Sequence, residues 1–344
     1  MRGVHVALYD YAIRNQEMLG NESIIFHDGI SEKNDASVIE KFRRNFEVIP
    51  YQDFDSLGKI SEKMGLDAIY IIKSGELDFQ VVNEVPNLIH AVFPQKICEV
   101  HGKVYAFVSE WLSRECSNSK IPFVPHMITM PQPGEDLREQ LNIPKQATVF
   151  GCYGGSDSFN LDFVHKTICD IVEKSKDCFF IFMNISPFAR HEKIIFLPGI
   201  SDSDYKAKFI STCDAMIHAR AIGESFGLAC GEFSVSNKPV ITYALSPQRS
   251  HIDILGNKAL LYKGPTDLRN IILDFDKTWA AKQNWDCYSD KFSPGPVMSK
   301  FREVFLEADT RTAAPEKITL QDKCMIQYFR ARKKLRNFSK KLYS

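Results

Sequence analysis

The sequence lacks net charge, paired cysteines and long apolar runs, and each absence excludes a class of protein. Lysine plus arginine and aspartate plus glutamate both number 43, so bulk charge predicts no nucleic-acid partner and no general attraction to membranes. The nine cysteines form no CxxC pair and no zinc-like spacing. We therefore interpret them as buried thiols of a reducing compartment rather than a disulfide framework.

Sorting signals are also missing. Residues 1–10 do not combine a basic segment with an apolar one, so no secretory signal is expected. No apolar run reaches the roughly 20 residues that a membrane helix needs. These absences predict a cytoplasmic protein. One segment departs from the even charge, because residues 323–344 hold eight lysines or arginines and no acidic residue. We interpret 323–341 either as a solvated or disordered tail or as a peripheral contact with an anionic membrane.

Short apolar strands alternate with helical patterns along the chain, which is typical of parallel α/β sheets built from βαβ units. Strands are expected at 3–9, 22–26, 46–49, 68–72, 88–93, 104–109, 149–152, 178–183, 194–196, 215–218, 238–242 and 259–261. Helices are expected up to residue 42 and at 56–65, 110–117, 161–174, 203–212, 268–275 and within 285–307. The fold class is therefore α/β.

The alternation pauses at 122–144, where five prolines disfavour a helix or a central strand. We expect an interdomain connection there, with a ligand cleft between two Rossmann-like domains. The expected parts are a first Rossmann-like domain at 1–130, a second at 131–284, a closing helical segment at 285–320 that crosses back to the first domain, and the basic tail at 321–344.

The segment Glu224-Ser-Phe-Gly-Leu-Ala-Cys-Gly-Glu232 carries the strongest chemical signal. A helix that starts near Ser225 or Phe226 would hold Glu232 on a defined face, since eight residues are a little over two turns. Its unpaired amides and dipole would form an anion site beside Glu224. One segment would then offer a phosphate cradle and two acceptors for sugar hydroxyls.

With its flanks, this segment resembles the donor half of GT-B glycosyltransferases of the retaining family often called GT4, or glycosyl transferases group 1. The resemblance covers roughly 149–261 and rests on Asp214-Ala-Met-Ile-His-Ala-Arg220, on Gly223-Glu-Ser-Phe-Gly-Leu228 and on Asn237-Lys-Pro-Val-Ile241. Over residues 1–125 only the α/β pattern is compatible. The resemblance implies a transferase that uses a UDP- or GDP-linked sugar and retains the anomeric configuration, with a glycan or a lipid-linked molecule as acceptor. It also implies that the domain at 1–130 is on the acceptor side and that the domain at 131–284 binds the nucleotide sugar.

The resemblance also implies roles for individual residues. Glu224 would contact the donor sugar, amides of Ser225, Phe226, Gly227 and Leu228 would hold the sugar and diphosphate, and Glu232 would accept hydrogen bonds from the ribose diol. Gly227 would let the backbone approach the donor. In the alternative interpretation it is only a helix-entry residue, and the segment is an ordinary βαβ unit with two surface glutamates.

The sequence departs from the family pattern in two places, and the first departure weakens the expectation that the donor is bound as it is in relatives. Relatives place an arginine and a lysine in the loop after the first strand of the second domain, whereas residues 151–160 contain neither. Gly154, Gly155 and Ser156 could still supply amides there. We expect Arg220 to be the main cation, with Lys206, Arg190 and Arg249 as further candidates, although an arginine is more often a surface residue.

The second departure lies in the first domain, where no glycine-rich loop follows the expected first strand. Tyr11, Arg14 and Asn15 are candidates for the acceptor side. By the resemblance, His90 would end a strand facing the donor and act with Glu224 and Arg220 in catalysis; otherwise it is a packed histidine. Ser109 and Glu110, and His218 and His251, are interpreted either as cleft residues or as structural hydrogen-bonding groups.

No metal and no cofactor are expected, because the nucleotide sugar is a substrate. Three Asp-x-Asp triplets start at Asp53, Asp202 and Asp274, but such triplets are common by chance. The residue at 201 or Asp202 is expected to cap a helix. Two other functions stay open: a non-catalytic sugar-nucleotide-binding module, and a nucleotide-sugar epimerase.

Overall fold

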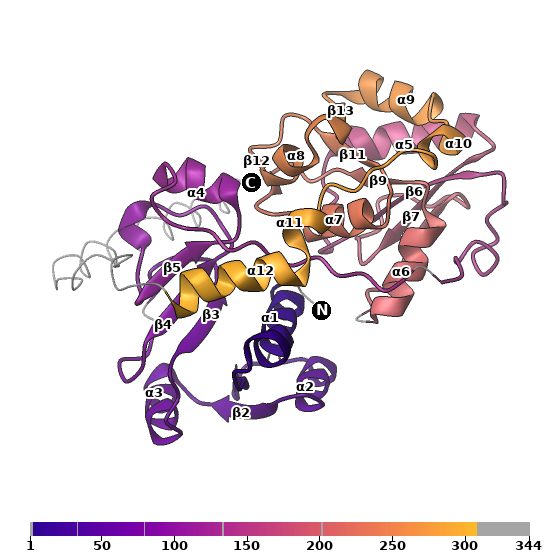
Figure 1. Cartoon of the computed structure of the whole chain (residues 1–344). Helices are drawn as coiled ribbons and strands as arrows, with labels where there is room; N and C mark the ends of the chain where they lie inside the picture. Colours follow the sequence, from indigo (N-terminus) through magenta and orange to yellow (C-terminus); the bar gives the residue numbers. More distant parts are fainter. Residues whose placement is uncertain (1–2, 33, 79, 133, 201, 308–344) are drawn as a thin grey trace, which may run out of the picture.

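The computed structural model describes residues 3–307, except residues 33, 79, 133 and 201. Two α/β halves are joined by two crossing segments (Figure 1). The predicted α/β class with parallel strands is confirmed, because every ladder between the named strands is parallel.

The C-terminal half is built on one six-stranded sheet in the order β13-β11-β9-β6-β7-β8. In chain order this is the 3-2-1-4-5-6 arrangement of a doubly wound sheet, so the order reverses between β6 and β9. Ligands of such sheets bind outside the carboxyl ends of the strands at that point. The strands are β6 (Thr148–Tyr153), β7 (Cys178–Met183), β8 (Ile194–Leu197), β9 (Ala215–His218), β11 (Val240–Tyr243) and β13 (Leu260–Tyr262).

Helices cover both faces of this sheet. The pair α5 (Asp162–Lys174) and α9 (Pro265–Leu273) packs on one side, and α6 (Ser203–Thr212) and α7 (Leu228–Val235) lie on the other (Figure 1). Sequence and structure agree closely here. The expected ranges 178–183, 203–212 and 215–218 coincide with β7, α6 and β9, and Asp202 caps α6 by accepting from two backbone amides. The remaining short elements are β10 (Gly223–Glu224), β12 (Gln248–Arg249), α8 (Ser250–Leu255), a 3₁₀ turn (Gly256–Lys258) and α10 (Lys277–Ala280).

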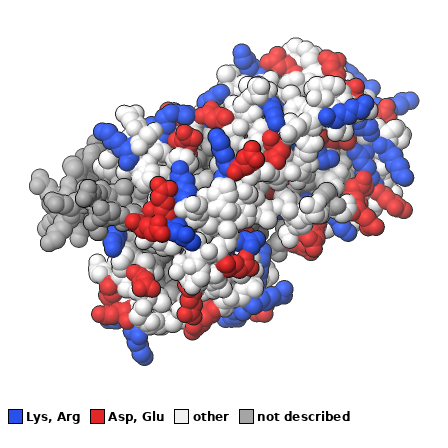
Figure 2. Space-filling view, viewed as in Figure 1, with Lys and Arg blue, Asp and Glu red and all other residues white. Residues whose placement is uncertain are grey.

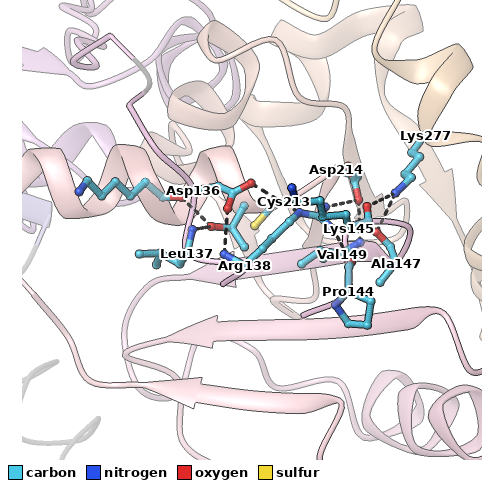
Figure 3. Close-up of polar contacts among 12 residues, drawn as sticks. Asp136, Leu137, Arg138, Pro144, Lys145, Ala147, Val149, Cys213, Asp214 and Lys277 are labelled. Carbon is cyan, nitrogen blue, oxygen red and sulfur yellow. Dashed lines mark hydrogen bonds and ion pairs between the residues drawn. The ribbon is translucent and has the colours of Figure 1, made fainter. Parts of the chain in front are cut away.

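A polar cluster fastens the connection after the linker to the amino ends of this sheet (Figure 3). Arg138 donates to Asp214 at 2.9 Å and to the carbonyl of Ala147 at 2.9 Å. Asp214 also accepts from the amide of Val149 at 2.8 Å, and Lys277 donates to three consecutive carbonyls from Lys145 to Ala147. Residues 137–149 are therefore tied to the C-terminal sheet at the edge opposite the ligand-binding edge.

The N-terminal half carries five strands in two separate sheets. β1 (Ile24–Asp28) pairs with β2 (Glu47–Tyr51), and a second sheet has the order β3-β4-β5. Its remaining elements are α2 (Ala36–Arg43), α3 (Phe54–Lys63), β3 (Ile69–Lys73), β4 (Asn87–Ala91), a 3₁₀ turn (Ile97–Glu99), β5 (Val104–Phe107) and α4 (Glu110–Ser117).

The expected first strand at 3–9 is wrong, because this segment opens helix α1 (Gly3–Leu19). Val4 and Val6 favour a strand locally, but the buried residues Ala7 and Tyr11 lie four positions apart, on one helical face. Tyr11 stacks on Phe301 with ring centroids 5.2 Å apart and donates to the carbonyl of Pro125 at 2.7 Å. Tertiary packing therefore overrides the local strand preference.

The segment after residue 285 is broken into three pieces rather than one helix: α11 (Ser289–Phe292), α12 (Pro294–Phe301) and a π-helical turn (Arg302–Leu306). Pro294 and Pro296 explain the break, since a proline ends one helix and can begin the next. Helix α12 packs on α1 of the N-terminal half, and Phe301 also contacts Tyr70 (Figure 1). The expected tail at 321–344, with its basic segment 323–341, and the rest of 285–320 lie outside the described residues.

Three findings concern the surface charge, the helices and the thiols. Acidic and basic side chains are interspersed over the face shown in Figure 2, in line with the balanced composition. In the part of the chain that the structure describes, no helix combines the length and the apolar character needed to cross a membrane. All eight cysteines of that part are free thiols, and Cys152, Cys178, Cys213 and Cys230 are buried.

Candidate functional site

The turn from β10 to α7 presents Glu224 at the reversal point of the C-terminal sheet. Glu224 ends β10, which pairs with β12, and α7 begins at Leu228, two to three residues later than expected. Gly227 caps α7 in the left-handed region with φ of 94°, where a β-carbon is strained. A β-carbon at Gly227 would also stand 2.9 Å from Cβ of His251. The glycine therefore has a packing reason that the sequence did not reveal.

Two cationic or polar groups hold the Glu224 carboxylate. Arg220 donates to Oε2 at 2.9 Å, and His218 Nε2 lies 3.2 Å from Oε1. Burial by itself would raise the pKa of Glu224, but the hydrogen bond from His218 and nearby positive charge, that of Arg220 included, lower it to about 2. The side chain is 20% exposed. Glu224 is therefore an ionised acceptor at neutral pH with a path to solvent.

Glu232 is more enclosed than expected. It is 6% exposed, and its two oxygens accept from the ammonium of Lys206 and the hydroxyl of Tyr153. The start of helix α1 lies against α7, the helix that carries Glu232, since a β-carbon at Gly3 would stand 3.3 Å from Leu228. Burial and the nearby charge of Glu232 raise the pKa of Asp10 in α1 to about 6. Only the second lone pair of each Glu232 oxygen is left for a ribose hydroxyl.

The loop after β6 has the amide-rich form expected of it. The carbonyls of Gly154, Gly155 and Ser156 accept hydrogen bonds from Asn184, Ser158 and Ser186. Among the described residues, no acceptor is found for the amides of 154, 155 and 156, and the loop is largely exposed. Of the other motif residues, Ser225 is half-buried, while the ring of Phe226 is buried against His126 and Phe292.

The catalytic and acceptor-side candidates of the N-terminal half are not brought to Glu224. His90 lies within β4, is 0% exposed, and contacts the carbonyl of Val124 at 2.8 Å and the hydroxyl of Tyr70 at 2.6 Å. Burial is the main cause that lowers the pKa of His90 to about 4. The expected strand-end position facing the donor is therefore wrong, and the alternative of a packed histidine describes what is seen.

The three acceptor-side candidates were placed in a loop, and that placement is wrong because all three lie in α1. Tyr11 is buried under α12, Arg14 pairs with Glu17 one turn away, and Asn15 donates to Ser23 at 3.0 Å. Within this helix the three side chains contact Phe301, Glu17 and Ser23 rather than the groups around Glu224.

A cavity of about 590 Å³ is lined by residues of α4, of α8 and of the segment 284–296. Ser109, Glu110 and Trp111 line it from the N-terminal half, and Phe226 and Ser250 line it from the C-terminal half. An ion pair between Arg114 and Asp253, at 2.8 Å, joins the halves at its rim. Ser109 also caps α4 by accepting from the amide of Leu112, so it both lines the cavity and serves as a structural hydrogen-bonding group.

Sequence reasoning missed Tyr153, Asp10 and Thr242. Tyr153 ends β6 and Thr242 lies on β11, so the signal that could have found them is their place at carboxyl ends of strands around the reversal point. Asp10 carries no such signal, because it approaches Glu232 from another half of the molecule.

The aspartate triplets have structural roles. Asp53, Asp202 and Asp276 each cap a helix through backbone amides. Within the described ranges, no three histidine, cysteine, aspartate or glutamate side chains gather as metal ligands would.

No family model and no curated protein matches the sequence. Solved structures do match the fold. Anabaena HepE in complex with UDP-glucose has a TM-score of 0.68 at 14% identity, over 90% of this chain and 97% of that chain. A glycosyltransferase from Rickettsia africae ESF-5 has a TM-score of 0.64 at 14% identity, over 89% and 94%.

A putative UDP-N-acetylglucosamine 2-epimerase from Listeria monocytogenes has a TM-score of 0.59 at 12% identity, over 93% of this chain and 97% of that chain. Together with the two Rossmann-like halves and the cavity between them, these likenesses confirm the predicted architecture: the chain has the GT-B fold.

Proposed function

We propose that the protein transfers a sugar from a UDP- or GDP-linked donor to a saccharide or lipid-linked acceptor, with retention of anomeric configuration. The observation that carries the proposal is the Glu224 carboxylate, ionised, partly open and held by Arg220 directly before the amino end of α7. Similarity to a structure that contains UDP-glucose supports a nucleotide-sugar donor.

In this proposal the donor lies across the carboxyl ends of β6, β9 and β11. Glu224 accepts hydrogen bonds from sugar hydroxyls, and the backbone amides of 225–228 and 154–156 face the diphosphate. Glu232 accepts ribose hydroxyls with its remaining lone pairs, beside Lys206 and Tyr153. Arg220 and Lys206 take the place of the absent arginine and lysine, so transfer is proposed to proceed without a metal.

The proposed reaction needs no protein nucleophile. The bond from the anomeric carbon to the departing phosphate oxygen breaks, and the acceptor oxygen attacks from the same face. The proton of the acceptor hydroxyl passes to the departing phosphate oxygen. Preorganised donors around the diphosphate stabilise the charge that develops on it, and closure of the halves limits hydrolysis.

We place the acceptor in the cavity between α4 and α8. Trp111 offers an apolar ring face, and Glu110 and Asp253 offer carboxylates that can accept hydrogen bonds from hydroxyl groups. Phe226, which lines this cavity, is two residues after Glu224 in the turn before α7, so donor sugar and acceptor are proposed to meet near its ring.

Slow release of sugar from nucleotide sugars tests the proposal. The full chain is incubated with a panel of UDP- and GDP-sugars, and free sugar and nucleotide are measured over hours. We expect hydrolysis of at least one donor, and a loss of about 100-fold or more in Glu224→Gln, since removal of one preorganised group costs that much. Asp170→Asn, which removes an exposed carboxylate paired with Arg269, is the control and keeps the wild-type rate. Equal rates in wild type and Glu224→Gln would overturn the proposal.

A non-catalytic binding module is the second candidate, favoured by the missing arginine and lysine and by the occupied oxygens of Glu232. It predicts that a nucleotide or its sugar raises the melting temperature without turnover on a broad acceptor panel. An epimerase, the third candidate, is separated by NMR of the product sugar. A melting temperature unchanged by every nucleotide and nucleotide sugar would contradict all three.

A further inference from the structure

Behind Glu224, three buried side chains continue its hydrogen bonds into the C-terminal half. His218 Nδ1 lies 2.9 Å from Oγ1 of Thr242, and the same Oγ1 lies 2.9 Å from Nε2 of His251. The exposed fractions of His218, Thr242 and His251 are 4%, 0% and 0%. The four groups come from β10, β9, β11 and α8 and form one continuous chain.

The sheet itself brings the middle of this chain together. His218 and Thr242 are register partners on the paired strands β9 and β11, so their side chains stand next to each other on one face. His251 lies in the first turn of α8, which follows β11 through β12, and its ring centroid is 4.7 Å from that of His218. The spacing is therefore set by rigid elements rather than by a loose loop.

We propose that Thr242 and His251 are positioning residues that, through His218, keep Glu224 aligned as a hydrogen-bond acceptor for the donor sugar. The role in donor binding rests on the proposed function. The direction of the hydrogen bonds from Glu224 to His251 does not rest on the proposed function, because it follows from the number of protons that each group carries.

That order can be worked out from Glu224. An ionised carboxylate only accepts, so Nε2 of His218 carries the hydrogen that it donates to Glu224. In a neutral imidazole the other nitrogen then accepts, so Nδ1 of His218 takes the single hydroxyl hydrogen of Thr242. The oxygen of Thr242 is left to accept from Nε2–H of His251.

His251, at the far end of this series of hydrogen bonds, supports the order. Nδ1 of His251 is buried without a partner among the described residues. In the derived order this nitrogen carries a lone pair and no hydrogen. The opposite order would bury an unpaired N–H there and a second proton on His218, close to Arg220. Burial is the main cause that lowers the pKa of His251 well below its usual value, which agrees with a neutral ring.

His251 also supports the turn that presents the amides before α7. Its Cβ would be 2.9 Å from a β-carbon at Gly227, so the two residues pack closely and the position has no room for a side chain. One histidine thus holds both the carboxylate, through Thr242 and His218, and the turn that follows it.

The test uses the full chain with ¹⁵N-labelled histidine. We expect NMR to show neutral rings with Nε2–H for both His218 and His251 at pH 7.5, assigned with His218→Gln and His251→Gln. A Nδ1–H tautomer or a doubly protonated ring at either position would overturn the proposal. This measurement needs no turnover, so it distinguishes failure of the hydrogen-bond chain from failure of the proposed transferase.

Matched threonine variants supply the second readout. Thr242→Val removes the hydroxyl and Thr242→Ser keeps it, while Thr212→Val removes another hydroxyl that is 0% exposed and makes two hydrogen bonds away from the site. We expect Thr242→Val to weaken donor-sugar binding or kcat/KM about tenfold, Thr242→Ser to stay within about twofold, and Thr212→Val to match wild type. Equal effects of the two valine variants, or no rescue by serine, would contradict the proposal. If Thr242→Val does not fold, the serine variant and the tautomers of the native chain decide.

Discussion

The two halves of the molecule share an α/β plan, yet they are built differently. The C-terminal half has one continuous six-stranded sheet, and fully buried aromatic side chains such as Phe150, Phe180 and Phe182 fill its core. The N-terminal half has two separate sheets, and two small clusters, around Phe42 and around Leu57, pack beside them. Glu224 stands on β10, which pairs with β12 outside the continuous sheet, but its partner His218 and the site residues Tyr153 and Thr242 stand on that sheet.

This difference shows which half holds the groups of the candidate site in fixed positions. Holding ionised groups in fixed positions requires supports that do not relax, and strands inside a packed sheet supply them. The N-terminal half contributes helices α1 and α4, which approach the site from outside. We therefore expect changes in the two halves to have unequal and predictable effects.

The largest expected effect is on stability. Phe180→Ala removes a ring that is 0% exposed in the middle of the continuous sheet and should lower the free energy of unfolding by about 3–5 kcal/mol. Phe42→Ala, in a cluster of five buried residues, should cost less because the site can relax. Urea unfolding followed by fluorescence measures both. Equal losses would show that the halves are equally well packed.

The next effect is on activity and compares two arginines. Arg220→Met removes the cation that holds Glu224, and we expect kcat/KM to fall about 30- to 100-fold. Arg14→Met in α1 removes a cation that pairs with Glu17 and should leave kcat/KM unchanged. Steady-state kinetics with the donor identified in the hydrolysis panel measures both. A large effect at Arg14 would restore the original acceptor-side interpretation.

A smaller effect concerns the contact between the halves. Burial and the charge of Glu232 raise the pKa of Asp10 from 3.8 to about 6, so the folded state holds this proton more tightly. The contribution to stability is complete below about pH 4 and is lost as pH rises through 6. Wild type should therefore lose about 1 kcal/mol between pH 5 and pH 8 that Asp10→Asn does not lose. Urea midpoints at the two pH values measure the difference, and parallel curves would place Asp10 away from Glu232.

The smallest effect is expected at the rim of the cavity. Arg114 and Asp253 join the halves at 2.8 Å, but both are well exposed, so Arg114→Met should change the free energy of unfolding by less than about 1 kcal/mol. The same variant should show a weaker dependence of the urea midpoint on salt. A loss of several kcal/mol would mean that this pair, rather than α1 and α12, holds the halves together.

Much of the C-terminal half could be predicted from local patterns. The strand 178–183 is a continuous apolar run, and the helix 203–212 has a capping aspartate at its start. In both segments the local sequence and the tertiary contacts favour the same secondary structure. The glycine-bearing turn at Gly227 is predicted from the sequence as a place where the backbone can approach a donor. Its contact with His251 is not, because the two residues are brought together only by the fold.

The N-terminal half was harder to predict, for physical reasons that particular residues illustrate. The valines at 4 and 6 favour a strand, yet the segment is helical because Tyr11 packs under Phe301, almost 300 residues away along the chain. His90 has the apolar flanks of a strand residue, and nothing local says that its ring nitrogens face Val124 and Tyr70.

By itself the sequence determined the α/β class, most strands and helices of the C-terminal half, and the place of Glu224 just before a glycine-bearing turn that opens a helix. These depend on periodicity, capping and glycine, which act over a few residues. Only the tertiary structure decided that Lys206 and Tyr153 take up the oxygens of Glu232 and that Thr242 and His251 stand behind His218. Those contacts join residues from different strands and helices, and the order of the strands, which no local pattern contains, brings them within hydrogen-bonding distance.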